Sequence, residues 1–170
     1  MKLLTAKDYL FSHIKKLLGP GRIPLSYNLT LNARHSDGVL FDTRHVHNMI
    51  MDAGEDEVAK LIGGITANAF TYIAMGTDNT APADSQTALI AEISTNGGSR
   101  AADSSPTSSG NVLTINYLFT ITGALAIVEA GLLNESSGGD MLARQIFDVI
   151  NLTADDTIEI IWEITAGTAR

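Results

Sequence analysis

The sequence predicts a mainly β protein: an antiparallel β-sandwich or jelly roll with one or two short helices and an N-terminal helical arm. In residues 113–121 and 157–165, apolar side chains occupy every second position and mostly polar ones lie between them, which is the period of a half-buried strand. Two further apolar segments lie between them and are separated by short polar turns. Strands that follow one another through short turns favour antiparallel sheets over a helical or parallel α/β fold.

The first residues form a segment of a different kind. Leu10, Ile14 and Leu17 recur at the i, i+4, i+7 spacing of an amphipathic helix, and a Gly-Pro-Gly sequence then ends the pattern. We therefore divide the chain into a helical arm, residues 1–24, and a β-sandwich domain, residues 25–170. At 170 residues the chain is long enough for one domain with a sizeable core.

Charge separates the same two parts. Residues 1–22 carry five Lys or Arg and one Asp, a net charge of +4, whereas the whole chain carries −8, which leaves −12 for the rest. The arm then has three interpretations: a surface helix packed on its own domain, an arm that docks on a neighbouring subunit, or a helix on a membrane surface. Lys15 and Lys16 would orient a docked arm on an acidic body. The membrane alternative is the weakest, since the helix is short and the body is acidic.

The domain begins with strand periodicity and continues into a helix. Alternate residues share one face at Leu25, Tyr27, Leu29 and Leu31. Asp52 and Glu55 have the spacing of a capping box, which predicts a helix from about residue 53 to residue 62. Gly63 and Gly64 end it.

The middle of the chain predicts one strand, one helix and one loop. Residues 70–75 read as a buried strand that runs into a turn. A second short helix is expected at residues 85–93, capped by Asp84 or Ser85. Residues 96–110 are rich in Gly, Ser, Asn and Asp, so an exposed loop is expected there.

Composition disfavours several function classes. The chain has no cysteine, which excludes disulfides, thiolate zinc sites and cysteine nucleophiles. Hydrolase, kinase and dinucleotide-binding motifs are absent, so we predict no enzyme, no catalytic residue and no cofactor. An acidic chain is repelled by phosphate backbones and anionic lipids, so neither nucleic acid nor membrane is an expected partner. Without an apolar run of roughly 20 residues or a signal segment, the chain is expected to be soluble and unprocessed.

His45 and His47 are the best metal-ligand candidates. Residues two apart on a strand point to one face, but a zinc site needs three or four ligands, and His35 or Asp42 would have to complete it. We therefore predict a structural or solvent-facing pair and no metal. A small enzyme or sugar binder that uses this histidine face remains an open alternative.

Glu129 is a single carboxylate inside an apolar segment, residues 128–134. A catalytic acid or base would want a second titratable group, and none lies near it in the sequence. A polar hairpin at residues 134–140 brings the following strand, residues 141–150, alongside. We therefore expect Glu129 to pair with Arg144 as part of the framework of the fold.

An ordered set of motifs resembles virion proteins of tailed bacteriophages. A strand ending in G-T-x-x-T-x-P precedes T-x-L-x-x-E, a V-E-A-G-L-L-N segment, L-x-R-x-x-F and D-x-x-x-I-x-W. In this chain they are Gly76 to Pro82, Thr87 to Glu92, Val128 to Asn134, Leu142 to Phe147 and Asp156 to Trp162. The resemblance covers residues 50 to 166, and the first fifty residues have no counterpart.

The resemblance implies a structural role in the virion. We expect a capsid decoration (cement) protein on the outer surface of the head, made in the host cytoplasm, that clamps neighbouring major-capsid subunits and oligomerises as a trimer. The residues expected to dock are Leu10, Ile14 and Leu17, with Lys15 and Lys16 setting the orientation. The alternative is a tail, baseplate or fibre component that contacts another protein or a glycan.

Overall fold

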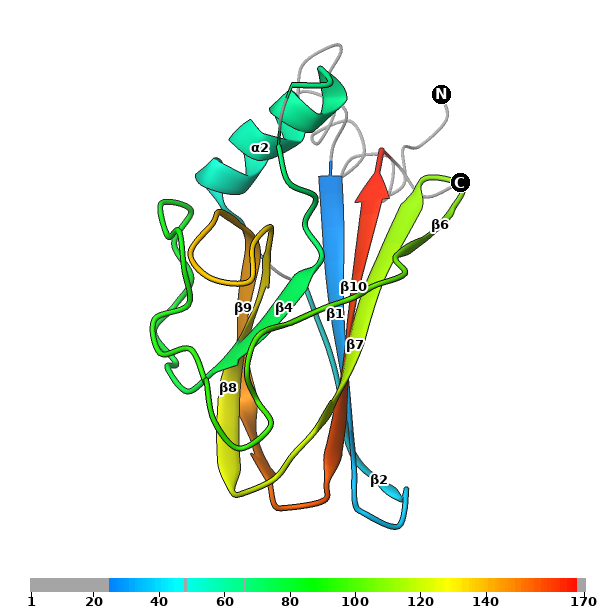
Figure 1. Cartoon of the computed structure of the whole chain (residues 1–170), viewed down its shortest axis with the longest axis vertical. Helices are drawn as coiled ribbons and strands as arrows, with labels where there is room; N and C mark the ends of the chain where they lie inside the picture. Colours follow the sequence, from blue (N-terminus) through cyan, green and yellow to red (C-terminus); the bar gives the residue numbers. More distant parts are fainter. Residues whose placement is uncertain (1–24, 48, 66, 168–170) are drawn as a thin grey trace, which may run out of the picture.

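The structure, a computed structural model, describes residues 25–47, 49–65 and 67–167. These residues form two five-stranded antiparallel sheets that face each other, with one helix at one end (Figure 1). The predicted β-sandwich class is confirmed. No helix within the described ranges combines the length and apolarity needed to cross a bilayer.

The first sheet has the strand order β2-β1-β10-β7-β6. Its strands are β1 (Leu25–Arg34), β2 (Leu40–His47), β6 (Thr107–Ser109), β7 (Val112–Thr120) and β10 (Thr157–Ala166). The central strands β1 and β10 pair along their whole length, from Leu25 opposite Ala166 to Arg34 opposite Thr157. The alternation in the sequence therefore turns one face of this sheet to the core and the other to solvent.

The second sheet has the strand order β3-β9-β8-β4-β5. Its strands are β3 (Met49–Ile50), β4 (Tyr72–Gly76), β5 (Ala101–Ala102), β8 (Leu125–Leu133) and β9 (Met141–Leu152). The polar turn at residues 134–140 joins β8 to β9 as an antiparallel hairpin, as predicted. Bulges in this pair, between Ile127 and Glu129 and between Leu132 and Leu133, shift the register.

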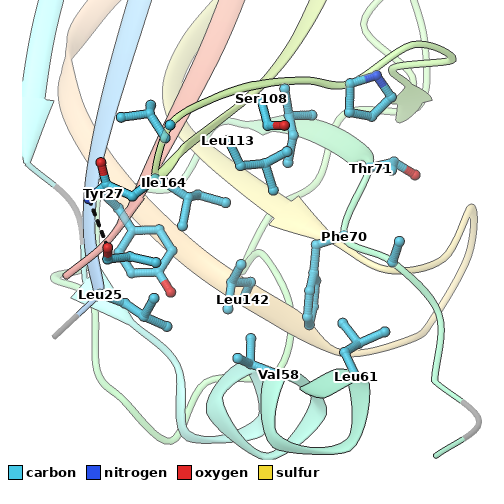
Figure 2. A pocket seen from close by; sticks show the side chains of 17 residues that line it. Leu25, Tyr27, Val58, Leu61, Phe70, Thr71, Ser108, Leu113, Leu142 and Ile164 are labelled. Carbon is cyan, nitrogen blue, oxygen red and sulfur yellow. Dashed lines mark hydrogen bonds between the residues drawn. The ribbon is translucent and has the colours of Figure 1, made fainter. Parts of the chain in front are cut away.

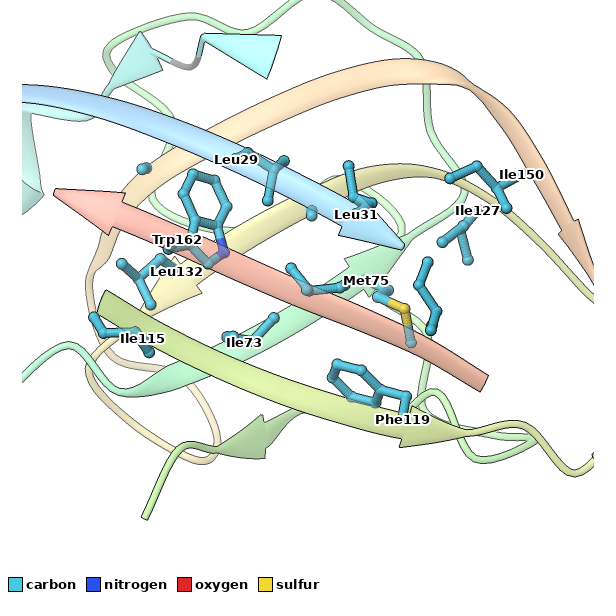
Figure 3. Packing of buried hydrophobic residues seen from close by; sticks show 14 of the residues in the cluster. Leu29, Leu31, Ile73, Met75, Ile115, Phe119, Ile127, Leu132, Ile150 and Trp162 are labelled. Carbon is cyan, nitrogen blue, oxygen red and sulfur yellow. The ribbon is translucent and has the colours of Figure 1, made fainter. Parts of the chain in front are cut away.

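The core fills the space between the sheets (Figure 3). Trp162 and Leu29 come from the first sheet, and Ile73, Ile127 and Leu132 from the second; all five are fully buried. A smaller apolar cluster lies on the other face of the second sheet, where Leu89 is one of its members. The residues of this second cluster are Met51, Ala74, Leu89, Leu133 and Met141.

The helix α2 (Asp52–Ile62) confirms the prediction, but the capping box is wrong. Met51 is the N-cap and makes no side-chain cap bond, so Asp52 lies in the first turn instead. The backbone fixes this start, because the Met51 amide donates to the Leu142 carbonyl at 2.9 Å. Gly63 forms the C-cap, as predicted.

The predicted helix at residues 85–93 does not form. This stretch is a loop held by backbone bonds to the edge of β4: the Thr77 amide donates to the Ala91 carbonyl at 3.0 Å, and the Ile93 amide donates to the Met75 carbonyl at 2.8 Å. Tertiary packing has overridden a local helix preference. The loop at residues 96–110 is largely exposed, as expected, but it also contributes β5 and β6.

Candidate functional site

Arg144 and Glu129 form a fully buried ion pair in the second sheet. The Arg144 Nε atom donates to Glu129 Oε2 at 2.8 Å, and Nη2 makes an ion-pair contact with the same oxygen at 2.8 Å. Arg144 lies opposite Gly131 in the register and Glu129 opposite Ile146, so the two side chains are diagonal neighbours on one face. The predicted pairing is confirmed.

The loop at residues 77–92, hereafter the covering loop, bonds to further atoms of this pair. The Ala91 amide donates to Glu129 Oε1 at 3.1 Å, and the Asp78 amide approaches the same oxygen at 3.4 Å. Arg144 Nη1 donates to the Thr80 carbonyl at 3.0 Å and to a side-chain oxygen, Gln86 Oε1, at 3.1 Å. A charge pair bonded on several sides holds the covering loop against the sheet.

Close packing leaves no room for a substrate at this pair. A Cβ atom at Gly76 would lie 2.2 Å from Glu129 Oε1, and one at Gly131 would lie 2.9 Å from Leu89 Cδ2. Both carboxylate oxygens of Glu129 are already engaged. The pair is therefore a framework element that fixes the covering loop.

Arg100 is a second anchor, which the sequence did not reveal. Its Nε and Nη2 atoms donate to the two oxygens of Glu92 at 2.9 and 2.6 Å, and Nη1 donates to the carbonyls of Glu135 and Gly138 at 2.8 and 2.9 Å. It joins the end of the covering loop to the turn between β8 and β9. Two of its acceptors are backbone carbonyls, which no side-chain pattern reveals.

His45 and His47 are exposed on the edge strand β2, as the solvent-facing interpretation expected. His45 Nδ1 lies 3.0 Å from the Thr30 hydroxyl, and a depression of about 190 Å³ beside the pair also contains Glu163. Across the described ranges, no three His, Asp or Glu side chains lie close enough together to hold a metal ion. Nor do His35 and Asp42 join the pair: His35 Nδ1 is 3.3 Å from Asp156, and Asp42 pairs with Arg44 at 3.0 Å.

An apolar groove of about 440 Å³ opens at the end of the sandwich where β1 begins (Figure 2). Three parts of the fold line it: the start of β1 together with the end of β10, one side of α2, and the segment that contains β6 and the start of β7. Its principal walls are Leu25, Tyr27, Val58, Leu61, Phe70, Leu113, Leu142 and Ile164. Most of these side chains also belong to the main core, so the core is open to the groove at this end.

The groove wall contains a buried hydroxyl, and an acidic helix lies beside the groove. The Tyr27 side chain is 4% exposed, and its hydroxyl has no hydrogen-bond partner within the described part of the chain. Burial, and after it the charge of Glu55, raises the pKa of this hydroxyl well above its usual range. Glu55 lies on α2, the helix that also carries the wall residues Val58 and Leu61.

The predicted docking residues of the arm lie outside the described residues. Leu10, Ile14, Lys15, Lys16 and Leu17 all fall within residues 1–24. The groove itself was not predicted. Its walls come from segments far apart in the sequence, since Tyr27 and Leu61 are more than thirty positions apart, so no local pattern brings them together.

Comparison with known proteins finds no matching family model, no similar curated sequence and no similar solved structure.

Proposed function

We propose that this chain is a structural protein of a tailed-bacteriophage virion, a capsid decoration protein on the outer surface of the head. The observation that carries the proposal is where the residues of the resemblance lie. Gly76, Thr80, Leu89, Glu129 and Arg144 come from four of the motifs and gather around the buried Arg144–Glu129 pair and the loop that covers it. Because these motifs together build one framework, they support the interpretation that this chain shares its architecture with the virion proteins it resembles.

The chemistry of the surfaces supports a binding role. A decoration protein needs interfaces that fit the assembled shell, since a protein that binds the assembled state stabilises that state by mass action. The body of this chain is acidic, which suits a position outside the shell and away from packaged DNA. In the proposal the arm docks on neighbouring major-capsid subunits through Leu10, Ile14 and Leu17, and Lys15 and Lys16 orient it.

We further propose that the protein binds as a homotrimer, as the resemblance implies. A trimer places three arms around one axis, so that one assembly contacts several capsid subunits at once and gains avidity. Light scattering of the full chain should then give three times the chain mass of 18.0 kDa. A monomer mass at micromolar concentration contradicts the trimer but leaves the decoration role standing.

Binding to phage heads tests the proposal. Full-length protein is mixed with heads of the phage that encodes it, assembled without this protein, and bound protein is measured by co-sedimentation. Saturable binding is expected for the wild type. The variant Leu10→Asp/Ile14→Asp/Leu17→Asp should lose at least about tenfold in affinity, because carboxylates at an apolar interface are desolvated without a partner.

A matched control carries the same three charges elsewhere. Ile90, Leu118 and Val149 are 47%, 56% and 47% exposed, so the triple change to Asp at these positions adds equal charge at exposed sites of the domain. This control should bind heads like the wild type. No binding by the wild type contradicts the decoration role, and equal binding by the arm variant contradicts the role of the arm.

A further inference from the structure

We propose that the apolar groove is the docking site for the arm of the same chain, so that in the free protein Leu10, Ile14 and Leu17 cover the open end of the core. The proposal concerns the protein before it meets any partner, and it goes beyond the proposed function. Four observations carry it: the groove walls, the buried Tyr27 hydroxyl, the position of Leu25 and the charges on the two sides.

Among the residues that the structure describes, no apolar element covers the groove. Its floor is made of core side chains such as Leu142 and Phe70, which are 2% and 6% exposed, while Leu61 and Leu113 on its rim are 38% and 37% exposed. Next to Leu61 in the chain, Ile62 is 82% exposed. Large apolar side chains gathered at an open end of a core mark a surface that another apolar element covers.

The Tyr27 hydroxyl is the second observation. It is buried in the groove wall and unpaired within the described ranges, although a buried hydroxyl is normally hydrogen-bonded. A segment lying in the groove would bring backbone or side-chain groups to it. Of the four buried side-chain atoms without a hydrogen-bond partner in the described ranges, the Tyr27 hydroxyl is the one in the groove wall, where an occupant would bond to it.

The place where the arm joins the domain is the third observation. Leu25 lines the groove and is also the first residue of β1, so the arm leaves the domain at the groove itself. The seven residues 18–24 separate Leu17 from Leu25, and they include Gly19 and Gly21, which favour a reversal of the chain. Seven residues span at most roughly 24 Å, so this linker keeps Leu17 close to Leu25 and hence to the groove.

Charge is the fourth observation. Residues 1–22 carry a net charge of +4, whereas α2 carries Asp52, Glu55, Asp56 and Glu57 against Lys60, a net charge of −3. Val58 and Leu61 of α2 line the groove, which puts this acidic helix beside it. A basic amphipathic segment fits an apolar groove with an acidic edge.

The tether decides between the arm of the same chain and the arm of another copy. A short flexible linker gives an effective concentration on the order of millimolar, far above the micromolar concentration of other copies. The arm of the same chain is therefore the favoured occupant. An arm that later docks on a neighbouring subunit must first leave this groove.

Disulfide trapping tests the inference, because the natural chain has no cysteine to interfere. Full-length Ile14→Cys/Leu61→Cys places one thiol on the arm and one on the groove rim. The control is Ile14→Cys/Leu118→Cys, whose second site is an exposed leucine on β7 with its side chain 56% exposed. Under mild oxidation the groove pair should form an intramolecular disulfide at least about tenfold faster than the control pair.

The products separate the outcomes on a non-reducing gel. A cross-linked monomer whose rate does not depend on protein concentration supports docking within one chain. A cross-linked dimer shows that another copy supplies the arm and overturns the proposal, as does a groove pair no faster than the control pair. Each result is independent of binding to heads, so this inference and the proposed function fail separately.

A second readout needs no disulfide. A single cysteine at Leu113→Cys on the groove rim should react with a maleimide several-fold faster when Leu10→Asp and Ile14→Asp are also present, since the uncovered rim is more accessible. Leu118→Cys should react equally in both backgrounds. Equal labelling of the Leu113→Cys site in both backgrounds overturns the proposal.

Discussion

Arg144 on β9 and Glu129 on β8 are joined by an Nε–Oε2 bond of 2.8 Å, with both side chains fully buried. The pair lies where the covering loop packs against the second sheet, and both of its side chains form hydrogen bonds with that loop. A buried pair of this kind is costly to break, because removing one partner leaves the charge of the other buried and unpaired.

The first prediction concerns this pair. Arg144→Met should lower the free energy of unfolding by about 3–5 kcal/mol, since Glu129 is left charged and buried. Arg44→Met is the matched control: Arg44 pairs with Asp42 at 3.0 Å on the edge strand, with its side chain 35% exposed, and should cost less than about 1 kcal/mol. Urea unfolding followed by Trp162 fluorescence measures both. Equal costs contradict the central role of the pair.

A second prediction tests how closely Glu129 is packed. Gly76→Ala should destabilise the protein by about 1–3 kcal/mol or more, because the added Cβ would overlap Glu129 Oε1. Gly63→Ala is the control, since its Cβ meets no atom nearer than 3.6 Å. The thermal unfolding midpoint should fall clearly for the first variant and stay nearly unchanged for the second. A neutral Gly76→Ala would contradict the packing described for this carboxylate.

The third prediction concerns the covering loop. Leu89 is 7% exposed and packs in the second apolar cluster, whereas its neighbour Ile90 is 47% exposed. Leu89→Ala should cost about 2–4 kcal/mol and speed hydrogen exchange at the Ala91 amide, which donates to Glu129. Ile90→Ala should change either quantity little. Similar effects from both substitutions would mean that the loop is not anchored through Leu89.

The fourth prediction is a loss of stability in acid. Bonds from the Thr153 amide and hydroxyl, at 2.8 and 2.9 Å, hold the pKa of Asp156 below its usual 3.8. A carboxyl whose pKa is lower in the folded state stabilises it above the ordinary pKa, and that contribution is lost as the pH falls through the lowered value. The urea concentration at the unfolding midpoint should therefore decrease when the pH is lowered below about 4.

Asp156→Asn isolates this carboxyl. The variant should be less stable than the wild type by about 1 kcal/mol at pH 7, and the difference should shrink as the pH falls through the lowered pKa of the wild-type carboxyl. Asp148→Asn, at an exposed position of β9, should show no such pH-dependent difference. A difference that does not change with pH would assign the effect to packing.

Local patterns predicted the strands because side-chain alternation directly reflects which face is buried. Ile158, Ile160 and Trp162 occupy every second position of β10, and all three are fully buried. The Arg144–Glu129 pair was predictable for a similar reason, since a short hairpin brings the two strands together. Local patterns are therefore predictive where two partners are joined by a short hairpin or where buried side chains recur with a fixed period.

The remaining features depend on contacts that no local pattern encodes. The stretch at residues 85–93 has the composition of a helix, yet backbone bonds near β4 hold it as an irregular loop. The groove depends on α2 and the β6–β7 segment lining the same opening, and the anchoring of Arg100 depends on backbone carbonyls. Partners of this kind become visible only when the whole chain is folded.

The most direct test of the central claim is a cryo-electron microscopy map of the whole virion. The decoration role predicts density for the two-sheet sandwich at repeated positions on the outer surface of the head, with the acidic body outward and the start of β1 toward the capsid. Density for this fold in the tail, baseplate or fibre, with none on the head, would contradict the decoration role and favour a tail component.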